Sequence, residues 1–83
     1  MAFKFENLQV WQRAMDLNDL IFQISKGFPQ EEKFNLTSQI RRAVDSVSLN
    51  IAEGSTSQTN PEFSRFLGYA IRSTVEVVCA LFI

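Results

Sequence analysis

Apolar residues recur every three to four positions along most of this chain, and the pattern is interrupted twice. The first interruption is the Gly-Phe-Pro run at 27–29, where glycine and proline stop a helix and redirect the chain. The second is the polar run at 54–61, which reads as a loop. The pattern therefore predicts three helices, over residues 7–26, 32–53 and 61–83.

The first predicted helix carries two apolar stripes, roughly 130° apart on a helical wheel. The wider stripe, expected in the core, comprises Val10, Ala14, Leu17, Ile21, Ile24 and Phe28. The second stripe comprises Trp11, Met15 and Phe22. Two interpretations of this second stripe stay open: packing on the third helix, or a protein–protein interface, where Trp and Met are enriched.

The second and third helices each present one main apolar face. In the second helix that face comprises Leu36, Ile40, Ala43, Val44, Val47 and Ile51, and Gly54 is the expected stop. We expect Ile40, Val44, Val47 and Ile51 to be core residues opposite Leu17, Ile21 and Ile24. The third helix is expected to start with Asn60 as N-cap and Pro61 in its first turn. Its predicted buried face comprises Phe63, Phe66, Leu67, Ala70, Ile71, Thr74, Val78 and Leu81.

The end of the third helix is apolar on nearly every side. Residues 77–83 carry no charge and no polar cap, and a helix that is apolar all round needs cover all round. We therefore expect an all-α, up-and-down antiparallel bundle in a single domain over 1–83. We expect this bundle to be incomplete at its C-terminal end, with a fourth helix missing or supplied by another chain. The expected oligomer interface comprises Trp11, Met15, Phe22, Phe82 and Ile83.

The composition excludes most catalytic chemistry. The chain has no His, a single Cys (Cys79) and three Gly, and it contains no phosphate-binding glycine motif. We expect no enzyme activity, no cofactor and no metal site. The net charge of -1 gives no overall attraction to nucleic acid or to anionic membranes. No signal peptide and no run of 18 apolar residues is present, so we expect a cytoplasmic protein without a membrane span.

Two polar sets are candidate sites. A stripe on the second helix comprises Gln39, Arg42, Ser46, Asn50 and Glu53, and it predicts either a hydrogen-bonded ladder between helices or subunits, or a ligand groove. The arginines Arg41, Arg42, Arg65 and Arg72 form the second set. Their guanidinium groups suit phosphate contacts, and simple surface ion pairing is the alternative.

The ordered motifs of the chain resemble those of a known family. They are the Leu-x-Val-Trp-Gln run at 8–12, the Gln-Ile-Arg-Arg-Ala run at 39–43 and the Asn-Ile-Ala-Glu-Gly run at 50–54, followed by spaced Phe, Leu, Ala, Ser and Glu residues over 63–76. Together they are similar to the proteins encoded in intervening sequences of bacterial 23S ribosomal RNA genes.

This resemblance implies a four-helix bundle that assembles into a ring-shaped homopentamer, and it implies no defined biochemical role. A related branch, the accessory proteins of diversity-generating retroelements, shares the fold, is basic and binds nucleic acid and a reverse transcriptase. This chain departs from that branch in its net charge. We therefore expect a homo-oligomeric interaction scaffold, with a weakly nucleic-acid-binding accessory protein as the alternative.

Overall fold

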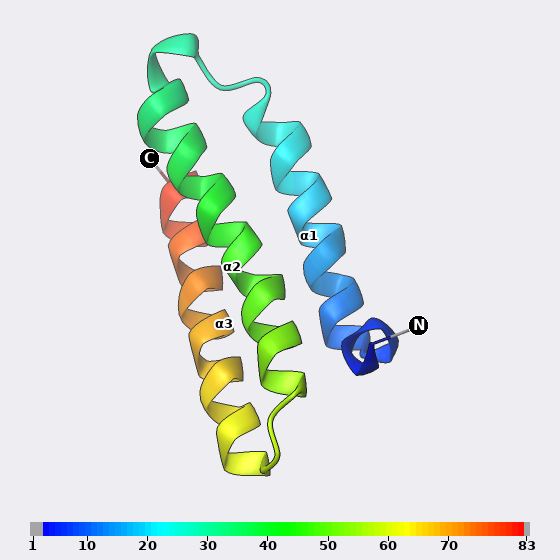
Figure 1. The fold of residues 1–83 in the computed structure, drawn as a ribbon. Helices are drawn as coiled ribbons and strands as arrows, with labels where there is room; N and C mark the ends of the chain where they lie inside the picture. The colour runs from blue at the N-terminus through cyan, green and yellow to red at the C-terminus, as the bar shows by residue number, and fades with distance from the viewer. Residues whose placement is uncertain (1–2, 83) are drawn as a thin grey trace.

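The computed structural model describes residues 3–82 and is helical over most of that range (Figure 1). A short 3-10 turn, η1 (Lys4–Asn7), precedes three long helices: α1 (Gln9–Ser25), α2 (Ser38–Ser55) and α3 (Asn60–Leu81). Successive helices run in opposite directions, and residues 3–82 contain no strand. The predicted all-α, up-and-down arrangement is confirmed.

Both predicted breaks are confirmed, but α2 begins later than predicted. A 3-10 turn (Gln30–Glu32) and a π-helical turn (Lys33–Thr37) follow Pro29, and regular α-helix starts only at Ser38. Asn35 and Thr37 are both weak helix formers, which fits an irregular winding at this point. The sequence pattern places the helical segment correctly and misses its change of winding.

The start of α3 differs from the prediction by one residue. Thr59, and not Asn60, is the N-cap: its backbone is extended, and its Oγ1 accepts a hydrogen bond from the Glu62 amide at 3.3 Å. The Glu62 carboxylate in turn accepts from the Gln58 amide at 3.3 Å. Threonine and asparagine are both good N-caps. Thr59 takes the position because its hydroxyl reaches the Glu62 amide.

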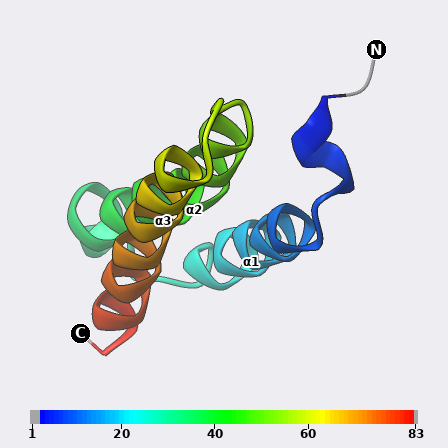
Figure 2. The ribbon, with the colours of Figure 1, turned by 90° about the horizontal axis from the view of Figure 1, so that it is seen from below.

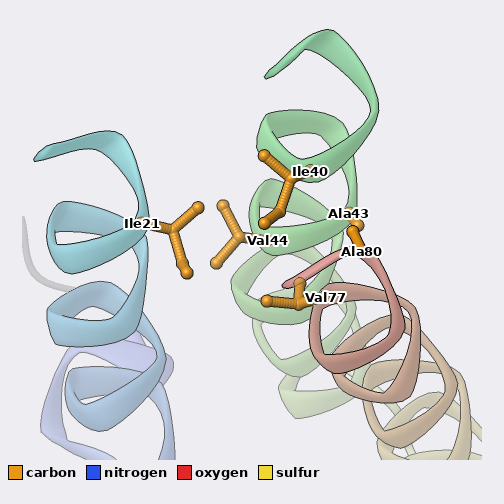
Figure 3. Packing of buried hydrophobic residues seen from close by; sticks show 6 residues of the cluster. All are labelled: Ile21, Ile40, Ala43, Val44, Val77 and Ala80. Atoms are coloured by element: carbon orange, nitrogen blue, oxygen red, sulfur yellow. The ribbon is translucent and has the colours of Figure 1, made fainter. Parts of the chain in front are cut away.

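Helix α2 occupies the centre of the packing and contacts both neighbours. One buried cluster joins Ile21 of α1, Ile40 and Val44 of α2, and Val77 and Ala80 of α3 (Figure 3). A second cluster comprises Ala14, Val47, Ile51 and Ala70. The predicted burial of Ile40, Val44, Val47 and Ile51 is confirmed.

Several residues predicted to be buried are instead exposed. Val10 and Ile24 of α1 are 48% and 43% exposed, and Ile71, Val78 and Leu81 of α3 are also exposed. In α3 the side that meets α2 carries Ala70, Val77 and Ala80. The periodicity identified apolar faces correctly, but α1 and α3 each have an apolar face wider than the part that α2 covers.

Gly54 has a different role from the predicted helix stop. It lies inside α2, which continues to Ser55, and it has no positive φ. A Cβ at this position would lie 2.6 Å from the Phe66 Cβ and 2.9 Å from the Phe63 Cδ1. The missing side chain therefore allows α2 and α3 to approach closely beside the loop that joins them.

We predict that Gly54→Ala lowers the free energy of unfolding by about 1–3 kcal/mol, the usual range for overpacking. The clash with the Phe66 Cβ cannot be relieved by a rotamer change, because Cβ is fixed to the backbone. Chemical denaturation followed by circular dichroism, at one protein concentration, measures the effect.

Gly68→Ala in α3 is the matched control, since a Cβ there meets nothing within 4 Å. It should be neutral or stabilising by up to about 1 kcal/mol, because alanine has the higher helix propensity. Equal destabilisation by the two substitutions would contradict the close-approach role of Gly54.

Candidate functional site

A groove with almost wholly apolar walls lies between α1 and α3, with α2 as its floor. It has a volume of about 370 Å³. Its lining comprises Val10, Arg13, Ala14, Leu17, Val47, Ile51, Leu67, Ala70, Ile71 and Thr74. Helices α1 and α3 both pack on α2 and have little contact with each other. Their ribbons lie apart in the view of Figure 2.

Both walls of this groove repeat with a seven-residue period. Val10 and Leu17 of the α1 wall are seven residues apart, and Leu67, Ile71 and Thr74 of the α3 wall follow at steps of four and three. A heptad-spaced apolar row is the seam against which another helix packs. The groove therefore has the shape and the spacing of a slot for a helix.

The second stripe of α1 lies on the other side of the α1–α2 pair. Trp11 and Met15 line a groove together with Phe5 and Leu49, and the Phe5 ring lies 4.9 Å from the Trp11 ring. Both stripe residues are half-buried. The short turn η1 thus covers part of this stripe.

Phe22, the third residue of that stripe, lies close to two cations. The Arg41 guanidinium carbon is 4.3 Å from the centre of the ring, and the Lys26 ammonium is 5.1 Å from it. Arg41 Nε also donates a hydrogen bond to Ser25 Oγ at 2.8 Å, and Ser25 is buried. Arg41 therefore holds α1 to α2, and the sequence pattern did not indicate this role.

Of the two interface candidates at the C-terminal end, Phe82 is 86% exposed. It directly follows α3, and its aromatic ring is the most exposed large apolar side chain in the described part of the chain. Ile83 lies outside the described residues.

The polar stripe of α2 divides into a hydrogen-bonded part and an exposed part. Ser46 Oγ accepts from Ser73 Oγ of α3 and from Asn50 Nδ2, both at 2.9 Å. Gln39 and Arg42 line a polar groove with Ser73 and Glu76, whereas Glu53 lies by the α2–α3 loop. The Ser46–Ser73 contact thus joins α2 and α3 within one chain.

The four arginines do not form one patch. Arg41 faces α1, and Arg42 faces the polar groove beside α3. Arg65 lies over the Phe66 ring at 5.6 Å, and Arg72 is exposed on α3. From the Ser46–Ser73 contact, Arg42 and Arg65 lie in opposite directions along the bundle, which separates them by roughly 18 Å at 1.5 Å per residue.

A second polar contact between helices was not predicted. Asn18 Nδ2 of α1 donates to the Asp45 carboxylate of α2 at 2.6 Å. On the helical wheel Asn18 lies beside Trp11 and Met15. This wheel position is the sequence feature that could have indicated a contact with α2. A charge-assisted hydrogen bond of this kind fixes the register of α1 against α2.

Residues 3–82 contain no group of three Asp, Glu, Cys or His side chains arranged to hold a metal ion. No described helix combines the length and the hydropathy that crossing a membrane requires.

We predict that single-stranded RNA binds weakly, in the non-specific range of roughly 10⁻⁴ to 10⁻⁶ M, and that binding weakens further between about 50 and 200 mM salt. The reason is that the arginines lie apart on a chain of net charge -1. Fluorescence anisotropy of a labelled oligonucleotide measures both quantities.

Arg42→Gln and Arg65→Gln should each weaken this binding only slightly, and Lys4→Gln in η1 is the charge-matched control. Tight binding that does not respond to salt would contradict this electrostatic account.

The chain was also compared with known proteins. A family model described as 23S rRNA-intervening sequence protein matches residues 6–83. No curated protein matches the chain. The family match spans nearly the whole chain, and the chain belongs to this family.

Proposed function

We propose that this member of the 23S rRNA-intervening sequence protein family is a non-catalytic helical-bundle protomer, which self-associates and serves as an interaction scaffold. The observation that carries the proposal is the apolar groove between α1 and α3. Its heptad-spaced walls suit a helix, and within residues 3–82 no segment of the chain fills it.

The exposed apolar side chains offer a large free energy of burial. Burying a Val, Leu, Ile or Phe side chain contributes roughly 1.5–3 kcal/mol. The exposed large apolar residues include Val10, Ile24, Ile71, Val75, Val78, Leu81 and Phe82. Covering several of them would contribute an amount comparable with the whole stability of a small domain, about 5–15 kcal/mol. Such a surface favours association.

The composition supports a role that does not depend on catalysis. A chain without His and with one Cys lacks the usual nucleophile, base and thiolate-cage groups. The structured polar contacts, Asn18 with Asp45 and Ser46 with Ser73, join helices to each other. They act in the folding of the bundle.

A nucleic-acid-associated accessory role is the second candidate. It is favoured by the exposure of Arg42, Arg65 and Arg72, whose side chains can reach phosphates. Their separation along the bundle makes this candidate weaker than self-association.

We predict that at micromolar concentration the protein forms particles heavier than its 9.5 kDa chain. Ile71→Glu, which places a charge in the wall of the groove, should lower the particle mass. Multi-angle light scattering after gel filtration measures it.

Gln23→Glu is the matched control, because it adds the same charge on the polar side of α1. It should leave the particle mass unchanged. A well-folded wild-type protein that stays at 9.5 kDa on concentration would refute self-association.

A further inference from the structure

The groove between α1 and α2 combines apolar and aromatic walls with a single charged side chain. It has a volume of about 440 Å³, and its lining comprises Phe5, Trp11, Met15, Asn18, Asp45, Ser48, Leu49 and Ala52. Asp45 is the one ionisable residue in this set. Pockets that hold small molecules have volumes of roughly 300–1,000 Å³ and apolar walls with a few polar groups. The groove has the size and the lining of such a site.

The charged part and the aromatic part of the groove lie at opposite ends. Asp45 of α2 faces Asn18 of α1, whose Nδ2 donates to the Asp45 Oδ1 at 2.6 Å. Because α1 and α2 run antiparallel, the step from Asn18 back to Trp11 corresponds to the step from Asp45 to Ala52 (Figure 1). At 1.5 Å per residue, the two ends are about 10 Å apart. An occupant that uses both ends therefore has a charged group and a separate apolar body.

The aromatic end of the groove is built by contacts within the chain. The Phe5 ring of η1 lies 4.9 Å from the Trp11 ring, at 59° to it. Gln12 Nε2 of α1 donates to the Glu6 carbonyl of η1 at 2.9 Å, which holds the turn against the helix. Leu49 is 59% exposed on the α2 wall. The groove thus presents aromatic rings on one wall and an aliphatic side chain on the other.

The arginines nearest to Asp45 in the sequence are engaged elsewhere. Arg41 precedes Asp45 by one helical turn, but its guanidinium group lies against Phe22, with its carbon 4.3 Å from the ring centre. Arg42 lines the polar groove beside α3. Asp19, exposed on the neighbouring stretch of α1, adds negative charge near the same end. The Asp45 end of the groove therefore attracts a cation.

We propose that this groove binds a small amphipathic organic cation, a primary amine with an aromatic or branched apolar body. The ammonium group pairs with the Asp45 carboxylate, and the apolar body packs between Trp11 and Leu49. The ammonium and the far edge of the body are then separated by up to about 10 Å, the length of the groove. This site is separate from the groove between α1 and α3, so the inference goes beyond the proposed self-association.

Other classes of small molecule match the groove less well. An anion is repelled by the Asp45 carboxylate. A neutral apolar molecule removes water from that carboxylate and offers it no partner in return. A polyamine satisfies the charge but leaves Trp11 and Met15 uncovered. Only a molecule that is both cationic and apolar uses the two ends together.

The first test compares phenylbutylamine with phenylbutanol, which has a similar length and body but no charge. Trp11 is the single tryptophan of the chain, so its fluorescence reports binding in the groove. The amine should change the emission saturably at low salt. Its dissociation constant should be roughly two- to fivefold below that of the alcohol, the difference that an exposed ion pair supports. This difference should shrink as salt is added.

The second test removes the charge that the proposal invokes. Asp45→Asn keeps an oxygen that accepts from Asn18, and it should abolish the difference between the amine and the alcohol. Asp16→Asn is the matched control, because it removes the same charge from an exposed position of α1 outside the groove. It should leave the difference unchanged.

A further pair of variants keeps the proposal testable if Asp45→Asn does not fold. Leu49→Lys places a cation in the wall of the groove and should weaken the amine more than the alcohol. Leu20→Lys is its control, since Leu20 is 56% exposed and lies outside the groove. Far-ultraviolet circular dichroism shows whether each variant has folded.

Four results would overturn the inference. They are the absence of saturable binding, equal affinity of the wild type for the amine and the alcohol, equal effects of Asp45→Asn and Asp16→Asn, and binding of spermidine as tight as that of phenylbutylamine. Selective binding of the amine by a protein that stays monomeric would support the cation site and refute self-association alone.

Discussion

The burial of α2 on two sides is the constraint on which the rest of this structure depends. Ile40, Val44, Val47 and Ile51 are almost fully buried, and residues of both α1 and α3 pack around them. Since α1 and α3 have little contact with each other, each is held mainly through α2. The polar contacts follow the same plan: Asn18 with Asp45 and Ser25 with Arg41 fix α1, whereas Ser46 with Ser73 fixes α3.

The same constraint produces the candidate site. A single central helix can cover only part of the apolar faces of its two neighbours. The uncovered parts, which include Val10 and Ile71, face a common space and form the walls of one groove. The groove is therefore the direct result of packing two broad amphipathic helices on one core helix. An occupant of this groove would complete a second layer of the core.

The sequence was sufficient for the helices, the breaks and the core of α2, because these follow from local periodicity and from glycine and proline. It was insufficient wherever the outcome depends on a neighbour. Ile71 and Ile24 have the periodicity of core residues, yet periodicity does not tell which side a neighbouring helix covers. Gly54 resembles a helix stop until Phe66 is seen beside it. Arg41 resembles a surface cation until its contacts with Phe22 and Ser25 are known. For the arginines, the helical wheel indicated which helix face carries each side chain. It did not indicate how far apart the side chains lie along the bundle axis.

The connection between α2 and α3 also has a consequence for how the chain folds. Only Thr56 to Thr59 separate the two helices, and the close approach at Gly54 lies directly beside this turn. Contacts that close short loops form quickly, because little chain entropy is lost in closing them. The link from α1 to α2 is longer and passes through two irregular turns. We therefore expect the α2–α3 hairpin to form first and α1 to dock on it later.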